Sequence, residues 1–238
     1  KIISAVCQEE KNVSELLALI DTTQPNMSQH LATLYRSGVL AKRRVGTQIY
    51  EGLVNRSRDF KLEPSLAESW ERVSPLVWRF RLRAGVSFHD GTPFTADDAV
   101  FSIERAMMRT SQRANQLRGI AGVSKLDART IEIRTAETDA VLPDKLWLVA
   151  MMSKAWSEKN KVTQPQDYNA RQETFSVRNA NGTGPFMLER YEADARTVLK
   201  ANPRWWGRGT PFGGGNLDEA VFVVIQSDAT RLAALASK

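Results

Sequence analysis

The pattern of residue types along the chain changes near Tyr50, and this change most constrains what its 238 residues can fold into. Residues 1–50 read as short helices joined by tight turns and contain no tryptophan. All six tryptophans and most turn dipeptides come after Glu51, and no linker rich in proline, glycine or serine separates the two parts. Domains commonly hold roughly 100 to 200 residues, so this length allows one large domain or two smaller ones. The change favours two, and we predict domains over residues 1–50 and 51–238.

Charge and cysteine content exclude several classes of protein. The chain has 33 Lys and Arg against 27 Asp and Glu, a net charge of +6, and 42% hydrophobic residues, which is typical of a globular protein. The single cysteine, Cys7, can form no internal disulfide, and the two histidines, His30 and His89, lie far apart. We therefore expect no metal site and no cofactor. No apolar run approaches the ~20 residues of a membrane span, so we expect no membrane insertion.

The first fifty residues predict two short helices and a hairpin. Apolar side chains at helical spacing line one face of residues 13–20, and a three-residue turn over 21–23 follows. Thr23 can cap a second helix, which Gly38 ends. Helices joined by so short a connection are typical of a helix-turn-helix. The second helix carries amide and hydroxyl groups on one face, which suit the base edges of DNA, although such a face is often only solvated.

Residues 22–50, TTQPNMSQHLATLYRSGVLAKRRVGTQIY, resemble the recognition helix and wing of ArsR-type winged helix-turn-helix repressors. The resemblance implies a DNA partner and a role in transcription regulation. Metal-sensing members carry a cysteine-rich motif where this chain has residues 13–18, so metal sensing is not expected. The repressors dimerise through flanking helices that this chain lacks, so we expect weak binding, mostly to phosphates. The candidate DNA-binding residues are Asn26, Ser28, Gln29, His30, Thr33, Lys42, Arg43 and Arg44.

Strands and helices interleave after Glu51 without the regular spacing of βαβ units. Alternation of Trp78, Phe80 and Leu82 with basic residues predicts a strand with one buried face. Thr95, followed three residues later by Asp98, predicts the start of a helix through a variant capping box. The sequence therefore predicts a mixed α/β or α+β domain. Further strands are expected at residues 130–135, 186–191, 197–199 and 220–225, and further helices near Leu142 and after Asp228.

The residues that could carry catalysis are better explained as structural groups. Asp90, Asp97 and Asp98 lie near His89, but carboxylates at a turn and at a helix N-terminus ordinarily act as caps. We therefore predict no catalytic residue and no enzyme. The Gly-Thr-Gly string at residues 182–184 lacks the lysine and the helix of a phosphate loop.

Six strings in order along the chain resemble the bacterial solute-binding proteins of family 5. They are IYEGLV, LEPSLAESWE, VWRFRLRAGVSFHDGTPFTADDAVFSIERA, GTGPF, NPRWWG and LDEAVFVVIQSDATRLAAL. The family includes periplasmic dipeptide and oligopeptide receptors of ABC transporters. The resemblance implies part of a periplasmic-binding-protein lobe, a peptide or small-solute ligand, a permease partner and no enzymatic activity. The candidate ligand-binding residues are Gly182, Thr183, Gly184, Trp205 and Trp206, although the tryptophan pair could equally pack a loop.

Ile49 and Tyr50 satisfy both resemblances at once. ArsR-type wings tend to read GTQIYY, and family 5 receptors tend to read IYEGL, so our hypothesis is a chimera of a truncated repressor and a truncated receptor. Two alternatives stay open: a DNA-binding regulator whose receptor part is incidental, and a non-functional chimeric fragment. The receptor family works in the periplasm, but the sequence as written starts at Lys1 without a leader, so we expect this chain in the cytoplasm.

Overall fold

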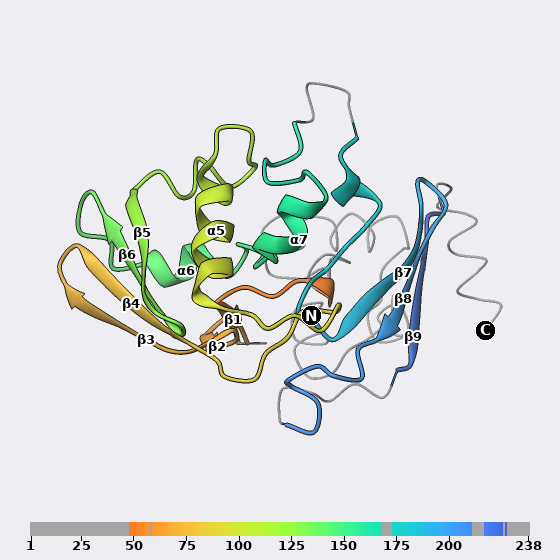
Figure 1. The fold of residues 1–238 in the computed structure, drawn as a ribbon, viewed down its shortest axis with the longest axis horizontal. Coiled ribbons are helices and arrows are strands. Elements are labelled where there is room, and N and C mark those ends of the chain that lie inside the picture. Colours follow the sequence, from red (N-terminus) through yellow and green to blue (C-terminus); the bar gives the residue numbers. More distant parts are fainter. Residues whose placement is uncertain (1–47, 58, 168–172, 211–216, 226, 228–238) are drawn as a thin grey trace, which may run out of the picture. The chain divides into compact units, whose positions relative to one another are not determined.

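The computed structural model describes residues 48–57, 59–167, 173–210, 217–225 and 227 (Figure 1). Internal contacts divide the chain into residues 1–44 and 45–238, and every described residue belongs to the second unit. The candidate DNA-binding residues, which run from Asn26 to Arg44, lie outside the described residues, as does Cys7. The helix-turn-helix and the domain boundary near Tyr50 therefore stay predictions.

A four-stranded antiparallel sheet is built on the predicted alternation. Its strand order is β3-β4-β6-β5. On β4, Phe80 and Leu82 are buried, whereas Arg81 on the other face is exposed, which confirms the predicted strand. Because the apolar side chains stand at every second position, they line only one face of the sheet. That face must be covered by another element packed against it, and the other face can be exposed to water. The strands are β3 (Ala67–Ser74), β4 (Val77–Leu82), β5 (Ile120–Asp127) and β6 (Thr130–Thr135).

Helix α5 (Ala96–Met107) packs against β5 and β6 and supplies that cover (Figure 1). Its start is the predicted capping box: the Thr95 backbone N–H donates to Asp98 Oδ2 at 2.9 Å. Ala99 and Ile103 are fully buried on its inner face and belong to the same apolar core as Phe80. Because the cap is a local pattern and the buried face follows the helical period, the sequence alone predicts this helix.

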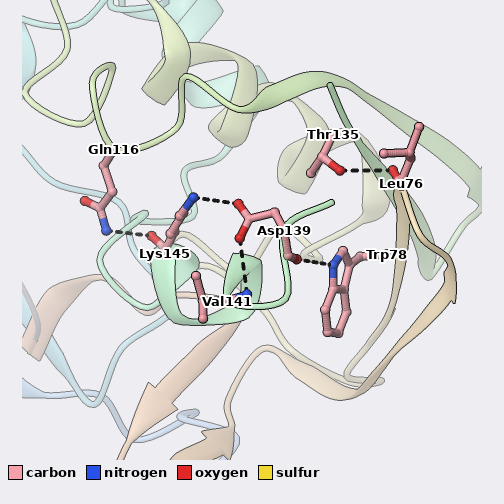
Figure 2. Close-up of polar contacts among 7 residues, drawn as sticks. All are labelled: Leu76, Trp78, Gln116, Thr135, Asp139, Val141 and Lys145. Atoms are coloured by element: carbon pink, nitrogen blue, oxygen red, sulfur yellow. Dashed lines mark hydrogen bonds and ion pairs between the residues drawn. The ribbon is translucent and has the colours of Figure 1, made fainter. Parts of the chain in front are cut away.

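The loop between β6 and α6 (Leu142–Leu146) is fixed by Asp139 (Figure 2). The Asp139 carbonyl accepts a hydrogen bond from Trp78 Nε1 at 2.9 Å, and its carboxylate forms an ion pair with Lys145 Nζ at 2.5 Å. The Lys145 carbonyl in turn accepts a bond from Gln116 Nε2 at 3.2 Å. A single aspartate thus ties the sheet, the loop and α6 together, and α6 is the helix predicted near Leu142.

The remaining elements form two smaller sheets and short helices. Strands β1 and β2 form a separate two-stranded antiparallel sheet, and β7, β8 and β9 form a three-stranded antiparallel sheet. The last three strands confirm the predictions for residues 186–191, 197–199 and 220–225, with ends shifted by a few residues. These elements are β1 (Val54–Arg56), β2 (Leu62–Pro64), α7 (Lys154–Lys159), the 3-10 helix η1 (Phe175–Val177), β7 (Phe186–Glu192), β8 (Arg196–Ala201) and β9 (Glu219–Val223).

The described helices are short. Within the described ranges, none has both the length and the apolar composition that a membrane crossing requires.

Candidate ligand-binding site

The carboxylate of Glu51 receives hydrogen bonds from both candidate tryptophans. Trp205 Nε1 donates to Oε1 at 3.1 Å, and Trp206 Nε1 lies 3.1 Å from Oε1 and 3.0 Å from Oε2. The two rings lie 5.6 Å apart, centroid to centroid, and are tilted by 57°. Because both indole N–H groups donate to one carboxylate, each hydrogen bond fixes the orientation of its ring.

Thr183 brings the second candidate segment to the same carboxylate. Its side chain is buried, and its hydroxyl makes no well-formed hydrogen bond among the described residues. The hydroxyl nevertheless lies close enough to Glu51 to favour the charged form of that carboxylate. The structure therefore brings Thr183 close to the carboxylate that Trp205 and Trp206 share, and a ligand-binding role for these residues stays a prediction.

Burial raises the pKa of Glu51 to about 7, from an ordinary value of 4.5. Loss of water around the carboxylate is the largest cause, because a buried charge is less stable than a buried neutral acid. The nearby Thr183 hydroxyl acts in the opposite direction, as do the hydrogen bonds from Trp206 and Trp205 and the positive charge of Arg83. Burial prevails over these contacts, so Glu51 changes charge near neutral pH.

Arg83 covers one face of Trp206. Its guanidinium carbon lies 4.0 Å from the ring centroid, which is a cation–π contact. Its Nε donates to the Ser65 carbonyl at 2.8 Å, so the side chain is held from two sides. One face of the Trp206 ring is therefore already occupied by a cation of the chain itself.

Gly182 and Gly184 are required by close packing of two backbones. A Cβ atom on Gly182 would lie 1.9 Å from the Ile49 carbonyl oxygen, and one on Gly184 would lie 2.5 Å from the Gln48 oxygen. The Gly184 N–H donates to the Ile49 carbonyl at 2.9 Å. The glycines thus hold the 182–184 segment against the backbone of Gln48 and Ile49, close before Glu51, and this packing explains the motif without a phosphate.

His89 holds the same segment from its other side. Gly182 N–H donates to His89 Nδ1 at 3.3 Å, and His89 Nε2 lies 3.1 Å from the Gly184 carbonyl. Burial lowers the pKa of His89 below its usual range. Asn202 Nδ2 also donates to the Gly184 carbonyl, at 3.1 Å, so this oxygen joins the histidine turn to the tryptophan loop.

The three acidic residues near His89 act as caps and surface partners. Asp90 Oδ1 accepts from the Thr92 N–H at 3.0 Å, and Asp98 caps α5. Asp97 forms an ion pair with Lys125 at 2.6 Å. Asp90 and Asp98 thus act as the caps that the sequence predicted, whereas the ion pair of Asp97 with Lys125 was not predicted. Within the described ranges, no three His, Cys, Asp or Glu side chains come together as a metal site.

Four residues of this arrangement were not predicted as site residues from the sequence: Glu51, Arg83, His89 and Asn202. Glu51 carried a usable signal, because an acidic residue inside the apolar string IYEGLV is unusual unless its charge has a partner. His89 and Asn202 carried none, because their partners lie far along the chain. Two hollows, of about 590 Å³ and 190 Å³, are lined by none of these residues and by none of the ligand-binding candidates.

Residues 61–238 match the family model of the bacterial extracellular solute-binding proteins, family 5 Middle. The chain belongs to this family. Residues 1–42 match the model of the bacterial regulatory protein, arsR family, so both predicted resemblances are confirmed. The second match is short, and it lies outside the described residues.

Family 5 relatives cover most of this chain but only part of their own length. Heme-binding protein A of Haemophilus influenzae is 30% identical over 212 residues, which cover 79% of this chain and 36% of that protein. A putative ABC transporter peptide-binding protein of Brucella ovis is 34% identical over 186 residues, covering 75% of this chain and 33% of that protein. The chain therefore spans about a third of these curated relatives.

A solved family structure confirms the fold class. DppA from Helicobacter pylori, described as an ABC transporter-associated periplasmic binding protein in complex with the peptide STSA, gives a TM-score of 0.66 at 25% identity. The match covers 83% of this chain and 41% of that one. The predicted mixed α/β fold of a periplasmic-binding-protein lobe is confirmed for residues in the described ranges.

Proposed function

We propose that residues 51–238 are part of the substrate-binding component of an ABC transporter that takes peptides or small solutes. Gly182, Thr183, Gly184, Trp205 and Trp206 would line one wall of the ligand cleft, and a permease would be the partner. The proposal assigns no catalytic residue and no cofactor. A receptor of this kind acts in the periplasm.

One observation carries the proposal: Glu51 joins the two candidate segments. Its carboxylate contacts Trp205 and Trp206, 154 and 155 residues away, and it lies beside Thr183. Rigid aromatic rings set around a few buried polar groups are typical of ligand sites. The names of relatives support the ligand class, since one is called a peptide-binding protein and another was solved with a peptide.

A single wall should bind weakly. Ligand pockets commonly bury most of the ligand surface, and enclosure supplies much of the affinity. This chain spans about a third of its curated relatives, so a cleft closed between two lobes would need elements beyond the residues printed here. We therefore expect millimolar, not micromolar, binding by the chain alone.

Titration of the 238-residue chain with the peptide STSA tests the proposal. Saturation-transfer NMR suits weak binding, and Trp206→Ala should abolish the transfer. Trp156→Ala is the matched control, because its ring packs on Phe175 with centroids 5.7 Å apart, whereas Trp205 and Trp206 pack on each other. Equal saturation transfer with the parent chain and with Trp206→Ala would contradict the assignment of the tryptophans to the ligand site.

Residues 1–50 support a second candidate function, DNA binding as an ArsR-type regulator. The arsR family match over residues 1–42 favours it. Each phosphate contact contributes about 0.9 to the slope of log affinity against log salt, so replacing Lys42, Arg43 and Arg44 by alanine should lower that slope by about 2.7. An unchanged slope would show that these three residues make no phosphate contacts with DNA.

The two functions belong to different compartments, so the junction needs its own test. A DNA reader works in the cytoplasm and a transport receptor outside the inner membrane. Amplification of source DNA across codons 45–55 would decide whether one transcribed reading frame joins them. An intact, transcribed frame with extended ends would overturn the interpretation of the fusion as an artefact of cloning or sequence assembly.

A further inference from the structure

The ring of His89 is bonded on both sides to one short segment. Gly182 N–H can only donate, so the His89 Nδ1 that faces it at 3.3 Å must carry no hydrogen. The Gly184 carbonyl can only accept, so the His89 Nε2 that lies 3.1 Å away must carry one. We assign the neutral ring with its hydrogen on Nε2, and neither the other tautomer nor the charged ring satisfies both bonds.

The backbone of His89 extends the same attachment to the tryptophan loop. Its N–H donates to the Gly182 carbonyl at 2.8 Å. Its carbonyl accepts from Arg204 Nη2 at 2.8 Å, and Arg204 directly precedes Trp205. The Gly184 carbonyl that faces the ring also accepts from Asn202 at 3.1 Å. His89, on the turn between β4 and α5, therefore contacts both segments of the candidate wall: residues 182–184 and the loop that carries Trp205 and Trp206.

We propose that His89 is a positioning residue whose neutral ring holds the 182–184 segment, and with it the proposed ligand wall, and that protonation of the ring releases this segment. The inference rests on the proposed function for its link to a ligand, but not for its structural part. A charged ring would present a hydrogen from Nδ1 to the hydrogen of the Gly182 amide, and the bond between them would be lost.

The charges around the ring place this release on the acid side of neutrality. Burial disfavours the charged ring and is the largest cause of the lowered pKa of His89, and the positive charge of Arg204 acts in the same direction. Asp90 and the Gly184 carbonyl act in the opposite direction but do not prevail. A histidine with a lowered pKa stabilises the fold above its unfolded value, about 6.5, and loses that contribution as pH falls through the folded value.

Nitrogen NMR of the histidine rings tests the assignment on the full chain. The chain has two histidines, so His30→Gln leaves His89 as the single signal. At pH 7.5 the spectrum should show a bare Nδ1 and a protonated Nε2, and the ring should titrate below about 6.5. A hydrogen on Nδ1 at pH 7.5, or a midpoint at or above that value, would overturn the proposal.

Substitutions separate positioning from simple loss of packing. Asparagine can present an oxygen near the place of Nδ1, whereas phenylalanine keeps the ring shape without an acceptor. Exchange protection of the Gly182 amide should fall about fivefold in His89→Phe, the equivalent of ~1 kcal/mol for one hydrogen bond, and His89→Asn should restore it. Equal protection in both variants would reduce His89 to a packing residue.

A pH series with the peptide STSA distinguishes failure of this inference from failure of the proposed function. In a Glu51→Gln chain, in which position 51 cannot titrate, binding should weaken between pH 7.5 and pH 5 in parallel with ring protonation, and the dependence should vanish when His89→Asn is added. Binding that stays constant while the ring titrates would overturn the inference alone. Absence of binding at pH 7.5, with Gly182 protected as expected, would overturn the proposed function and leave the role of His89 in holding the segment.

Discussion

Trp206 Nε1 lies 3.1 Å from Oε1 and 3.0 Å from Oε2 of Glu51, so one indole N–H is shared between both oxygens of a single carboxylate. The two residues are 155 positions apart in the sequence. This bond and its neighbour from Trp205 join the start of the receptor part to the loop after β8. Burial also makes the charged form of this carboxylate less stable than in water, because its effect outweighs that of the hydrogen bonds.

Glu51 should make the fold less stable as pH rises. Its folded pKa of about 7 lies above the ordinary 4.5, so the folded chain binds the proton more tightly than the unfolded chain. The stabilising contribution is complete below pH 4.5 and is lost as pH rises to about 7, and it amounts to roughly 3 kcal/mol. Urea unfolding of the parent and of Glu51→Gln from pH 5 to 8 measures it, because the variant should lack this slope. Glu71→Gln, at an exposed carboxylate, should keep the slope of the parent.

Alanine at Gly182 should prevent normal folding. Its Cβ would lie 1.9 Å from the Ile49 carbonyl oxygen, which is a backbone atom and cannot rotate aside as a flexible side chain could. We expect a loss of more than about 4 kcal/mol in urea unfolding, or no folded protein. Gly122→Ala is the matched control, since no atom lies within 4 Å of its Cβ. A Gly182→Ala chain as stable as the control would disprove the close approach.

Removal of the Arg83 side chain should loosen Trp206. Arg83→Ala loses a cation–π contact at 4.0 Å and a hydrogen bond to Ser65, together worth about 1–2 kcal/mol. The pKa of Glu51 should rise further, because the positive charge of Arg83 lowers it. Urea unfolding and carboxyl NMR measure the two effects. Arg81→Ala removes an exposed cation 4.0 Å from Glu68 and should change stability by less than ~0.5 kcal/mol. Similar losses in both variants would contradict the role of the ring contact.

Two ion pairs of different exposure should contribute unequally to stability. Asp139 is 13% exposed in its pair with Lys145, and it also holds the Val141 N–H at 3.2 Å. Asp139→Ala should therefore cost about 1–3 kcal/mol in urea unfolding, since it leaves a half-buried amine and an amide without an acceptor. Asp97→Ala breaks a pair whose side chains are 41% and 56% exposed and should cost less than ~1 kcal/mol. Equal losses of unfolding free energy in the two variants would show that burial does not strengthen the Asp139 contacts drawn in Figure 2.

The elements that the sequence predicted are those with a local cause. Phe80 and Leu82 alternate with basic residues, and a strand with one buried face follows from that period alone. Thr95 and Asp98 are three positions apart, so the capping box of α5 is complete within one turn. The ends of β7, β8 and β9 were less accurate, because strand ends depend on which partner strand continues the ladder.

The sequence by itself determined the family, the mixed α/β composition and the Gly-Thr-Gly and Trp-Trp strings as places of interest. The tertiary structure alone decided why they belong together: Glu51 accepts from tryptophans 154 and 155 residues away, and His89 bonds to glycines 93 and 95 residues away. Periodicity and capping act over a few residues, and they carry no information about which distant segments meet. The raised pKa of Glu51 and the single tautomer of His89 exist only after those segments have packed and excluded water.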